Sequence, residues 1–421
     1  MKKKVFFSLI VLTLLALVAL PLFSGCARAP TPPPEKDKIV FGAVRPLSGP
    51  LNFFEQFGMG PVYKLWVDQV NAKGGIYVRE YDKQLPIEVL TYDDGSDMGK
   101  MTRLLERLIL EDKVDFVFPP CSTAFLYAAA PIFNKHGYIL FGGEGGATSI
   151  TAQLPSLPYV FMPLNYSDHY QVPRLVEILA DLGVKTAAIV FIGDLHGIEY
   201  SGVAAPALAV AGIDVKMNKS VPPGTPDLSP LLKEAKALDV DAFLSFTYPP
   251  ETPTITAQAI ALGINFDVFL LGPGGSYTVV KEGIGGNEAM EGVMAWGAWN
   301  GKSSPAAAEF EATMIDRYGP IVTDYWGQIT FMASLQFLEQ AIVDAGTLDQ
   351  AVIRDVMAKN TYETVMGPYF YDIQGGGGGL LAEEVYLGQV GQWQSGVFEV
   401  IDVGPLRTAP PIYPKPDWPA P

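Results

Sequence analysis

Short apolar runs alternate with segments of helical spacing from Ile39 onward, and this alternation constrains the fold more than any other feature. In the helical segments, apolar residues recur every three or four positions, whereas the runs between them are continuous. The strands expected in this first series are residues 39–44, 87–92, 114–118 and 138–141. Strands that alternate with helices in this way form parallel sheets joined by crossover helices.

The same alternation starts again after Tyr159. It predicts strands at 186–192, 213–218, 242–246 and 268–271. The helices are expected near 171–182, between the first two of these strands and ending at residue 211, at 228–238 and at 254–262. After Gly292 the pattern changes to long helices and then a strand pair, expected at 306–318, 327–345, 348–359, 385–390 and 397–403. The predicted fold class is therefore α/β with two doubly wound parallel sheets, and 421 residues are enough to build both.

The charge of the chain argues against nucleic acid as a partner. Lysine and arginine together number 29 against 45 aspartates and glutamates, which gives a net charge of −16 at pH 7. Removal of the first 25 residues would take three lysines away and leave the remainder more acidic. Such a surface repels a phosphate backbone.

Residues 1–25 have the organisation of a signal peptide. Lysines follow Met1, an apolar stretch runs from Val5 to Leu22, and Phe23-Ser24-Gly25-Cys26 closes it with small residues and a cysteine. This end resembles the lipobox of bacterial lipoproteins, in which the cysteine is acylated and becomes the new N-terminus, although Phe23 stands where leucine is usual. An uncleaved membrane helix is the alternative, because the apolar stretch is just long enough to span a bilayer.

Proline and glycine mark three further segments. Residues 26–38, which follow the signal peptide, contain Cys26 and four prolines. This composition indicates an extended tether. The proline-rich tail, 405–421, is expected to be an irregular end on the surface. The five glycines at 375–379 have neither a clear strand before them nor a Lys-Ser/Thr pair after them, so they predict a flexible loop and not a phosphate site.

The motif Pro-Pro-Cys-Ser-Thr, residues 119–123, lies where an expected strand ends and an expected helix begins. Helix N–H groups and the hydroxyls of Ser122 and Thr123 could hold a carboxylate there. The simpler alternative is an ordinary helix cap made by either hydroxyl. A nucleophile is a third alternative, but it would need an activating base, and the chain has only three histidines.

No catalytic or metal motif supports an enzyme. No serine lies in a G-x-S-x-G elbow, and no pair of histidines or cysteines has zinc spacing. Asp194-Leu195-His196 could supply two metal ligands, but a lone Asp-x-His in a loop is more often a turn or a capped helix start. We therefore expect no cofactor, no metal and no enzymatic activity. A surface hydrolase that uses Ser122 or Ser276 is the catalytic alternative.

Over nearly the whole mature chain, the sequence resembles the type I periplasmic binding proteins of ABC importers, in particular the group that binds branched-chain amino acids and amides. The resemblance runs through IVFGAVRPLSGP from Ile39, VNAKGGI from Val70, YDDGSD from Tyr92 and YLGQVGQWQSGVFEVI from Tyr386. It implies a chain that crosses three times between two lobes. Lobe one would contain residues 39–161 and 297–371, and lobe two residues 162–296 and 372–404.

The resemblance also implies a binding site. In the amino-acid binders, a serine-rich loop and an Ala-Thr loop hold the ligand's carboxylate, and a Tyr-x-Pro-Glu segment contributes from lobe two. The matching positions are Ser122, Thr123, Gly146, Ala147, Thr148, Tyr248 and Glu251, and Phe53, Phe54 and His196 fall where relatives line the cleft. Gly274 stands where relatives have the acid that pairs with the ligand's ammonium. Either Glu251 or another acid such as Glu144 replaces it, or the ligand has no ammonium.

Together these implications describe an extracytoplasmic lipoprotein, anchored to the membrane through Cys26. It would capture a small carboxylate, amino acid or amide by closing two lobes, and deliver it to the permease and ATPase subunits of an ABC importer. A ligand sensor of the same fold that signals to a membrane partner is the alternative. Cys121 falls where some relatives place one half of a disulfide, but the other position holds Ser96, so a buried thiol is expected.

Overall fold

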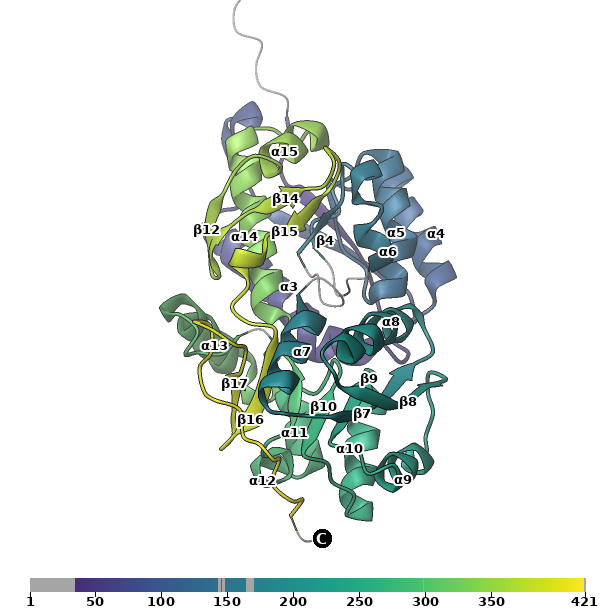
Figure 1. Ribbon diagram of the computed structural model, residues 1–421. Coiled ribbons are helices and arrows are strands. Elements are labelled where there is room, and N and C mark those ends of the chain that lie inside the picture. Colours follow the sequence, from purple (N-terminus) through teal and green to yellow (C-terminus); the bar gives the residue numbers. More distant parts are fainter. Residues whose placement is uncertain (1–34, 143–144, 146–147, 164–169, 298, 420–421) are drawn as a thin grey trace, which may run out of the picture.

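The computed structural model describes residues 35–142, 145, 148–163, 170–297 and 299–419. Its helices and strands form two halves around two sheets, which lie one above the other in Figure 1. We call the half around the first sheet the upper half and the half around the second sheet the lower half, after that view. The predicted α/β fold with two sheets is confirmed.

The first sheet is parallel and has the order β4-β1-β5. Its strands are β1 (Ile39–Arg45), β4 (Ile87–Asp93) and β5 (Phe116–Phe118). The main helices of the upper half are α2 (Asn52–Phe54), the π-helical turn η1 (Glu55–Met59), α3 (Gly60–Ala72), α4 (Met98–Leu110), α5 (Thr123–His136), α6 (Thr148–Thr151), α14 (Gln328–Ala345) and α15 (Gln350–Met357). Two short hairpins, β2 (Ile76–Val78) with β3 (Lys83–Leu85) and β12 (Tyr362–Thr364) with β13 (Gly367–Tyr369), complete it.

The second sheet has seven strands in the order β17-β16-β11-β10-β9-β7-β8. The parallel part consists of β7 (Thr186–Ile192), β8 (Asp214–Val221), β9 (Ala242–Phe246), β10 (Val268–Leu271) and β11 (Met294–Trp296). Two antiparallel strands, β16 (Val390–Gln394) and β17 (Val397–Val400), extend it at one edge. The helices of the lower half are α7 (Gln171–Asp181), α8 (Leu195–Val210), α9 (Ser229–Ala237), α10 (Glu251–Leu262), α11 (Thr278–Ile284) and α12 (Gly286–Met290), and α13 (Pro305–Tyr318) follows β11.

Helix boundaries follow local capping chemistry. Side chains accept an N–H of the first turn at the starts of four helices: Asp97 for α4, Asp194 for α8, Ser304 for α13 and Asp349 for α15. Left-handed glycines end three helices: Gly137 after α5, Gly263 after α10 and Gly346 after α14. The capped-start interpretation of Asp194-Leu195-His196 is thereby confirmed.

The glycine run is a packed turn, and the prediction of a flexible loop was wrong. It connects β14 (Tyr371–Ile373) to β15 (Gly379–Leu381), which pairs in parallel with β6 (Phe161–Met162). The N–H of Gly378 donates to the Leu154 carbonyl at 2.6 Å, and a Cβ at Gly377 would lie 2.2 Å from the same oxygen. Glycine is needed there because the two backbones approach too closely for any side chain.

Two expected strands are replaced by side-chain hydrogen bonds to the backbone. Residues 138–141 form only an isolated bridge at Leu140, and the N–H of Ile139 donates to the Gln350 amide oxygen instead. The strand expected at 385–390 starts only at Val390, because the Asp402 carboxylate accepts the N–H groups of Gln389 and Val390. In both places a side chain takes the donors that a neighbouring strand would otherwise use.

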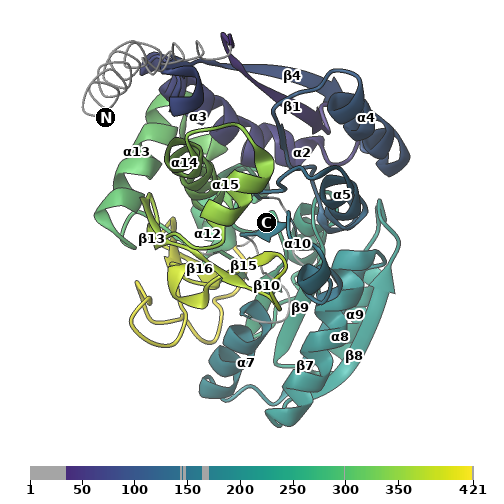
Figure 2. The same cartoon turned by 90° about the horizontal axis from the view of Figure 1, so that it is seen from above.

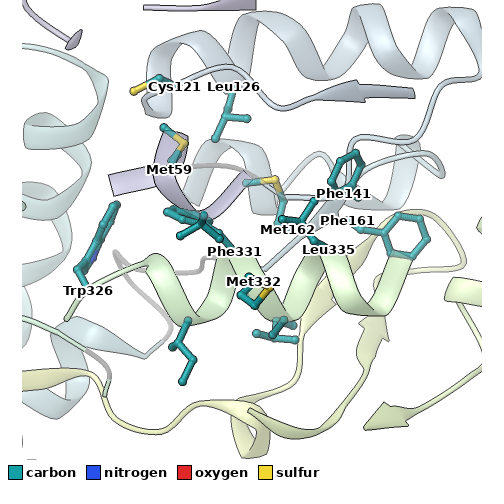
Figure 3. Packing of buried hydrophobic residues seen from close by; sticks show 14 of the residues in the cluster. Met59, Cys121, Leu126, Phe141, Phe161, Met162, Trp326, Phe331, Met332 and Leu335 are labelled. Carbon is teal, nitrogen blue, oxygen red and sulfur yellow. The ribbon is translucent and has the colours of Figure 1, made fainter. Parts of the chain in front are cut away.

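The long helix α14 organises the core of the upper half. Figures 1 and 2 place it beside α3, and Figure 3 shows Phe331, Met332 and Leu335 of α14 among side chains from distant segments. Met162 and Phe161 of β6 belong to the same buried cluster. Each such side chain contributes about 1.5–3 kcal/mol by its burial. Residues that follow the parallel strands of the second sheet therefore complete the core of the first.

The proline-rich tail has no helix or strand between residues 405 and 419, as expected, but it is bound to the lower half. The Trp418 ring nitrogen donates to the Ile264 carbonyl at 2.6 Å, and its ring packs edge to face on Phe269. Lys415 is 4% exposed, and its N–H donates to the Asp267 carbonyl. These contacts attach the tail just before β10.

Asp324, which precedes α14, connects the two halves. Its fully buried carboxylate accepts N–H bonds from Trp326 at 2.7 Å and Gly327 at 3.0 Å, and the Ser276 hydroxyl of the lower half at 3.2 Å. Tyr277, next to that serine, forms an antiparallel bridge with Asp324. Burial raises the pKa of Asp324 to about 7.

We expect Asp324→Asn to gain stability relative to the wild type as the pH rises from 5 to 7. The folded wild type keeps a proton on Asp324 that the unfolded chain releases near its ordinary pKa, so this group lowers wild-type stability as pH rises. The gain should be at most about 1.4 kcal/mol per pH unit. Urea unfolding at both pH values measures it. Asp37→Asn, whose side chain is 95% exposed, is the control, and the gain of Asp324→Asn between the two pH values should exceed the gain of this variant. A pH-independent difference for Asp324→Asn would contradict the assignment.

Candidate functional site

The candidate site lies where the carboxyl ends of the two sheets meet. Segments after β1 and β5 in the upper half and after β7, β9 and β10 in the lower half supply its residues. Ring contacts join the halves, with centroids 6.0 Å apart for Phe54 and Tyr248 and 5.2 Å apart for Phe53 and Tyr277. Ligands of open parallel sheets bind at such carboxyl ends.

Ser122 has a backbone conformation that serine rarely adopts. Its φ is 79° and its ψ is 155°, a region occupied almost only by glycine. It holds the N-cap position of α5, yet its hydroxyl makes no capping hydrogen bond, so the expectation of an ordinary side-chain cap was wrong for Ser122. Strain of this kind, with the polar group left for another partner, is typical of functional sites.

The second loop of the predicted site, which contains Gly145, closely approaches Thr123. Thr123 is 3% exposed and starts α5, and a Cβ on Gly145 would lie 2.5 Å from its nitrogen and 2.8 Å from its hydroxyl oxygen. Gly145 has a φ of 136°, so the approach depends on glycine. The predicted residues Gly146 and Ala147 lie outside the described residues, and Thr148 is described only as the first residue of α6.

Arg45 holds the start of the Pro-Pro-Cys-Ser-Thr segment by a hydrogen bond. This arginine is 2% exposed, and it donates to the carbonyl of Pro119 and to the carboxylate of Glu55 at 2.8 Å. Cys121 is a fully buried thiol, as expected. The loop that presents Ser122 is therefore held by a buried charge.

On the lower half, Tyr248 and Asp194 form the centre of the site. The Tyr248 hydroxyl donates to Asp194, whose other oxygen caps α8 by accepting the N–H of Gly197 at 3.1 Å. The ring of His196 lies 5.5 Å from that of Tyr248 and 4.5 Å from that of Tyr200. Burial lowers the pKa of His196 to about 4, so its imidazole is neutral at pH 7.

Glu251 is 1% exposed at the start of α10. One of its oxygens accepts the backbone N–H of Gly224, and the other has no hydrogen-bond partner in the described part of the chain. Burial raises its pKa. Gly274, where the acid is missing, has a φ of 97°, and a Cβ there would lie 2.8 Å from Cγ of Pro249. An acidic side chain at 274 would therefore displace the proline.

The structure brings Phe53, Phe54, Tyr248 and His196 to one aromatic seam between the halves. Sequence reasoning missed Tyr277, which is fully buried and packs against both phenylalanines. It also missed that Asp194 is the partner of Tyr248. The available signal for Tyr277 was its place soon after the strand ending at Leu271, where loop residues reach the site.

Two sheets with their carboxyl ends facing each other across polar and aromatic side chains define a binding protein of two halves. The model of the family described as periplasmic binding protein matches residues 38–395. The chain belongs to this family, whose members act outside the cytoplasm. No helix among the described residues is both long and apolar enough to cross a membrane.

The chain is also similar to individual members of the family. It is 25% identical to the Leu/Ile/Val-binding protein of Escherichia coli strain K12 over 311 residues, 73% of this chain and 80% of the relative. A leucine-binding protein from Thermotoga maritima superposes with a TM-score of 0.71 at 19% identity, over 86% of this chain and 97% of the other. A solute-binding protein from Rhodopseudomonas palustris BisB5 also reaches 0.71, at 18% identity over 91% and 99%. The resemblance found in the sequence is confirmed.

Proposed function

We propose that this protein is the solute-binding component of an ABC importer and captures a small carboxylate-bearing ligand between its two halves. The observation that carries the proposal is the strained Ser122, whose hydroxyl is not used by its own helix. It stands at the start of α5, where unpaired N–H groups and the helix dipole attract an anion. These are the donors that a carboxylate needs.

The ligands mentioned in the names of similar proteins all have a carboxylate, but they differ in most other features. The Escherichia coli relative is a Leu/Ile/Val-binding protein, and a similar Streptococcus pneumoniae protein was solved with isoleucine. The protein from Rhodopseudomonas palustris BisB5 was solved with 3,4-dihydroxybenzoic acid. Amino acids and aromatic acids share a carboxylate and an apolar body. The rings of Phe53, Phe54, Tyr248 and Tyr277, which pack on one another between the halves, suit such a body.

Binding would act by favouring the closed arrangement of the halves. A ligand that touches Ser122 above and Tyr248 below interacts with both halves only when they are closed, and so shifts the population toward that state. The moving lobes would be residues 39–161 with 297–371, and 162–296 with 372–404. The closed shape would then be recognised by the permease, and the ATP would be consumed by separate subunits.

The proposal includes no chemical conversion of the ligand. Ser276, one candidate nucleophile of the hydrolase alternative, is fully buried and donates its hydroxyl to Asp324. His196 lies against Tyr200 and Tyr248. We therefore expect the ligand to be recovered unchanged after long incubation with the protein.

Calorimetric titration of the chain from Ala27 onward tests the proposed function. Leucine, isoleucine, phenylalanine and benzoate are the first ligands, and at least one should bind with a dissociation constant of about 10 μM or tighter, or roughly −7 kcal/mol. Mass spectrometry of the recovered ligand completes the experiment. If none of these compounds binds, or if a bound one is converted, the proposed function is wrong.

Membrane anchoring through Cys26 is part of the proposal, although residues 1–34 lie outside the described residues. Its support is the small-residue sequence that ends in Cys26 after an apolar stretch. A lipid at that position and the following tether, residues 27–38, would keep the binding protein near its permease. Mass spectrometry of the protein extracted from membranes checks this, and an unmodified residue 26 would contradict it.

A further inference from the structure

A cavity of the upper half lies between α3 and the first sheet, outside the candidate site, and we call it the α3 cavity. Its volume is 310 Å³, and residues of β1, β4, β5 and α3 form its walls together with Glu55 of η1. β4 is the edge strand of this sheet and lies at the margin of the molecule in Figure 2. The volume falls within the range of small-molecule sites, at its lower end.

The walls of the α3 cavity range from buried to exposed. Ala43 on β1 and Phe118 on β5 are 3% and 2% exposed, whereas Val89 on β4 is 38% exposed. The side chain of Lys64 on α3 is 64% exposed. The cavity therefore opens to water between α3 and the edge strand, and its buried apolar walls can take the apolar body of a small molecule.

Arg45 lines the α3 cavity and has hydrogen-bond donors that are not used. A guanidinium has five N–H groups. Three of them have acceptors, namely Glu55 at 2.8 Å, the Pro119 carbonyl and the Met59 sulfur at 3.0 Å. The other two, one on each terminal nitrogen, have no acceptor among the described residues, although Arg45 is only 2% exposed. Donors buried this deeply are normally paired, so a ligand with an acceptor oxygen suits them.

The charges that line the α3 cavity are already paired. Four charged side chains contribute to its walls. Arg45 pairs with Glu55 at 2.8 Å, and Lys64 pairs with Asp68 at 3.3 Å. Arg317, which also donates to Asp68, is 41% exposed and is not one of the lining residues. An ion that entered would lose its hydration without gaining an unpaired counter-charge, so the cavity favours a neutral molecule.

Two residues of the α3 cavity also support the candidate site. Glu55 begins η1 directly after Phe54, whose ring packs against the lower half. Arg45 donates to the carbonyl of Pro119, which precedes Ser122 by three residues. π-Helical turns such as η1 are rare and frequently occur at functional sites. A molecule that contacts Arg45 and Glu55 therefore restricts both segments of the upper half that reach the candidate site.

We propose that the α3 cavity is a second binding site, which takes a small neutral molecule with an apolar body and an acceptor oxygen, and that this molecule tightens binding in the candidate site. Its oxygen accepts the two unused N–H groups of Arg45 and leaves the contacts with Glu55 and Pro119 in place. The occupied cavity reduces the motion of both segments, so the other ligand has less order to impose when it binds. The second site does not depend on the proposed function, whereas the coupling rests on it.

Matched small molecules test the second site. Nuclear magnetic resonance of the chain from Ala27 onward would compare acetophenone with toluene, which lacks the oxygen, and with benzylammonium, which is charged. We expect acetophenone to bind with a dissociation constant of about 1 mM or tighter, as usual for a molecule of its size. It should bind at least about 10-fold more tightly than the other two. If acetophenone does not bind, or if either of the others binds as tightly, the proposed ligand class is wrong.

Variants that close the α3 cavity assign the binding to it. Val89→Trp puts a large ring at the opening, on a strand that accepts aromatic residues, and Val67→Phe reduces the space from α3. Each should weaken acetophenone binding by about 10-fold or more, with the fold checked by circular dichroism. Val343→Trp is the control, because Val343 on α14 is 42% exposed and does not line the cavity. If both cavity variants bind acetophenone like the wild type, the assignment is overturned.

Calorimetry of the ligand of the candidate site, with and without saturating acetophenone, tests the coupling. We expect acetophenone to tighten that binding by about 5-fold or more in the wild type and in Val343→Trp, and to change nothing in Val89→Trp. Unchanged or weaker binding in the wild type would contradict the coupling. If no ligand of the candidate site is found, the proposed function fails, while the acetophenone titrations still decide whether the α3 cavity is a site.

Discussion

Replacing Arg45 with methionine should lower the free energy of unfolding by about 3 kcal/mol, because a buried ion pair then loses one partner. The guanidinium donates to Glu55 and to the Pro119 carbonyl, contacts Met59 sulfur at 3.0 Å, and lies 5.2 Å from the centre of the Tyr63 ring. The Glu55 side chain, 17% exposed, would remain without its cation. Urea unfolding followed by circular dichroism measures the change.

Arg174→Met is the control for this result. Arg174 is 39% exposed and pairs with Glu177 and Glu383, so water can replace its partners. Its loss should cost less than about 1 kcal/mol. If the two variants were destabilised equally, burial of Arg45 would not be the source of its effect. A large effect of Arg45→Met alone would show that the buried contacts of Arg45 with Glu55 and Pro119 contribute strongly to the stability of the upper half.

Replacing Ser122 with alanine should weaken binding of the ligand found by calorimetry by about 1.5–3 kcal/mol, the usual contribution of a hydrogen bond to a charged group. Ser122→Gly should weaken binding equally, since it removes the same hydroxyl. The glycine variant, however, should be more stable than the alanine variant by about 1–3 kcal/mol, because a φ of 79° with a ψ of 155° strains every residue except glycine.

Titration and thermal unfolding of both variants separate the two effects. Ser156→Ala is the control, because its exposed hydroxyl donates to the Gln153 carbonyl of its own turn and to no other described residue. It should bind ligand like the wild type. Unchanged affinity in Ser122→Ala would move the carboxylate site away from α5. Equal stability of the glycine and alanine variants would show that the backbone of Ser122 is not strained.

The fold could be predicted well because each strand and helix has a local pattern. The strands 186–192 and 242–246 were expected with the bounds that β7 and β9 have. What failed depends on partners far along the chain. Residues 138–141 look like a strand, but Gln350 takes the N–H of Ile139. Periodicity contains no information about such a side chain, more than two hundred residues away.

The site could be predicted in part for the same reason. Ser122 stands out because a polar pair follows an apolar strand, which is visible locally. The contacts of Arg45 with Pro119 and of Tyr248 with Asp194 join residues 74 and 54 positions apart, and no local pattern indicates them. The positive φ of Ser122 was equally invisible, because serine is common at helix starts with ordinary backbone angles.

The two ends of the described chain are attached to different halves, so the distance between them reports how far the halves are open. Residues 35–38 enter the first sheet at the amino end of β1, and the tail is fixed just before β10, at the amino end of a strand of the second sheet. Because the carboxyl ends face the site, both termini of the described chain lie on the sides remote from it. The end-to-end distance therefore follows the angle between the halves. Dyes coupled near both termini would record opening and closing by energy transfer, without a label near the ligand.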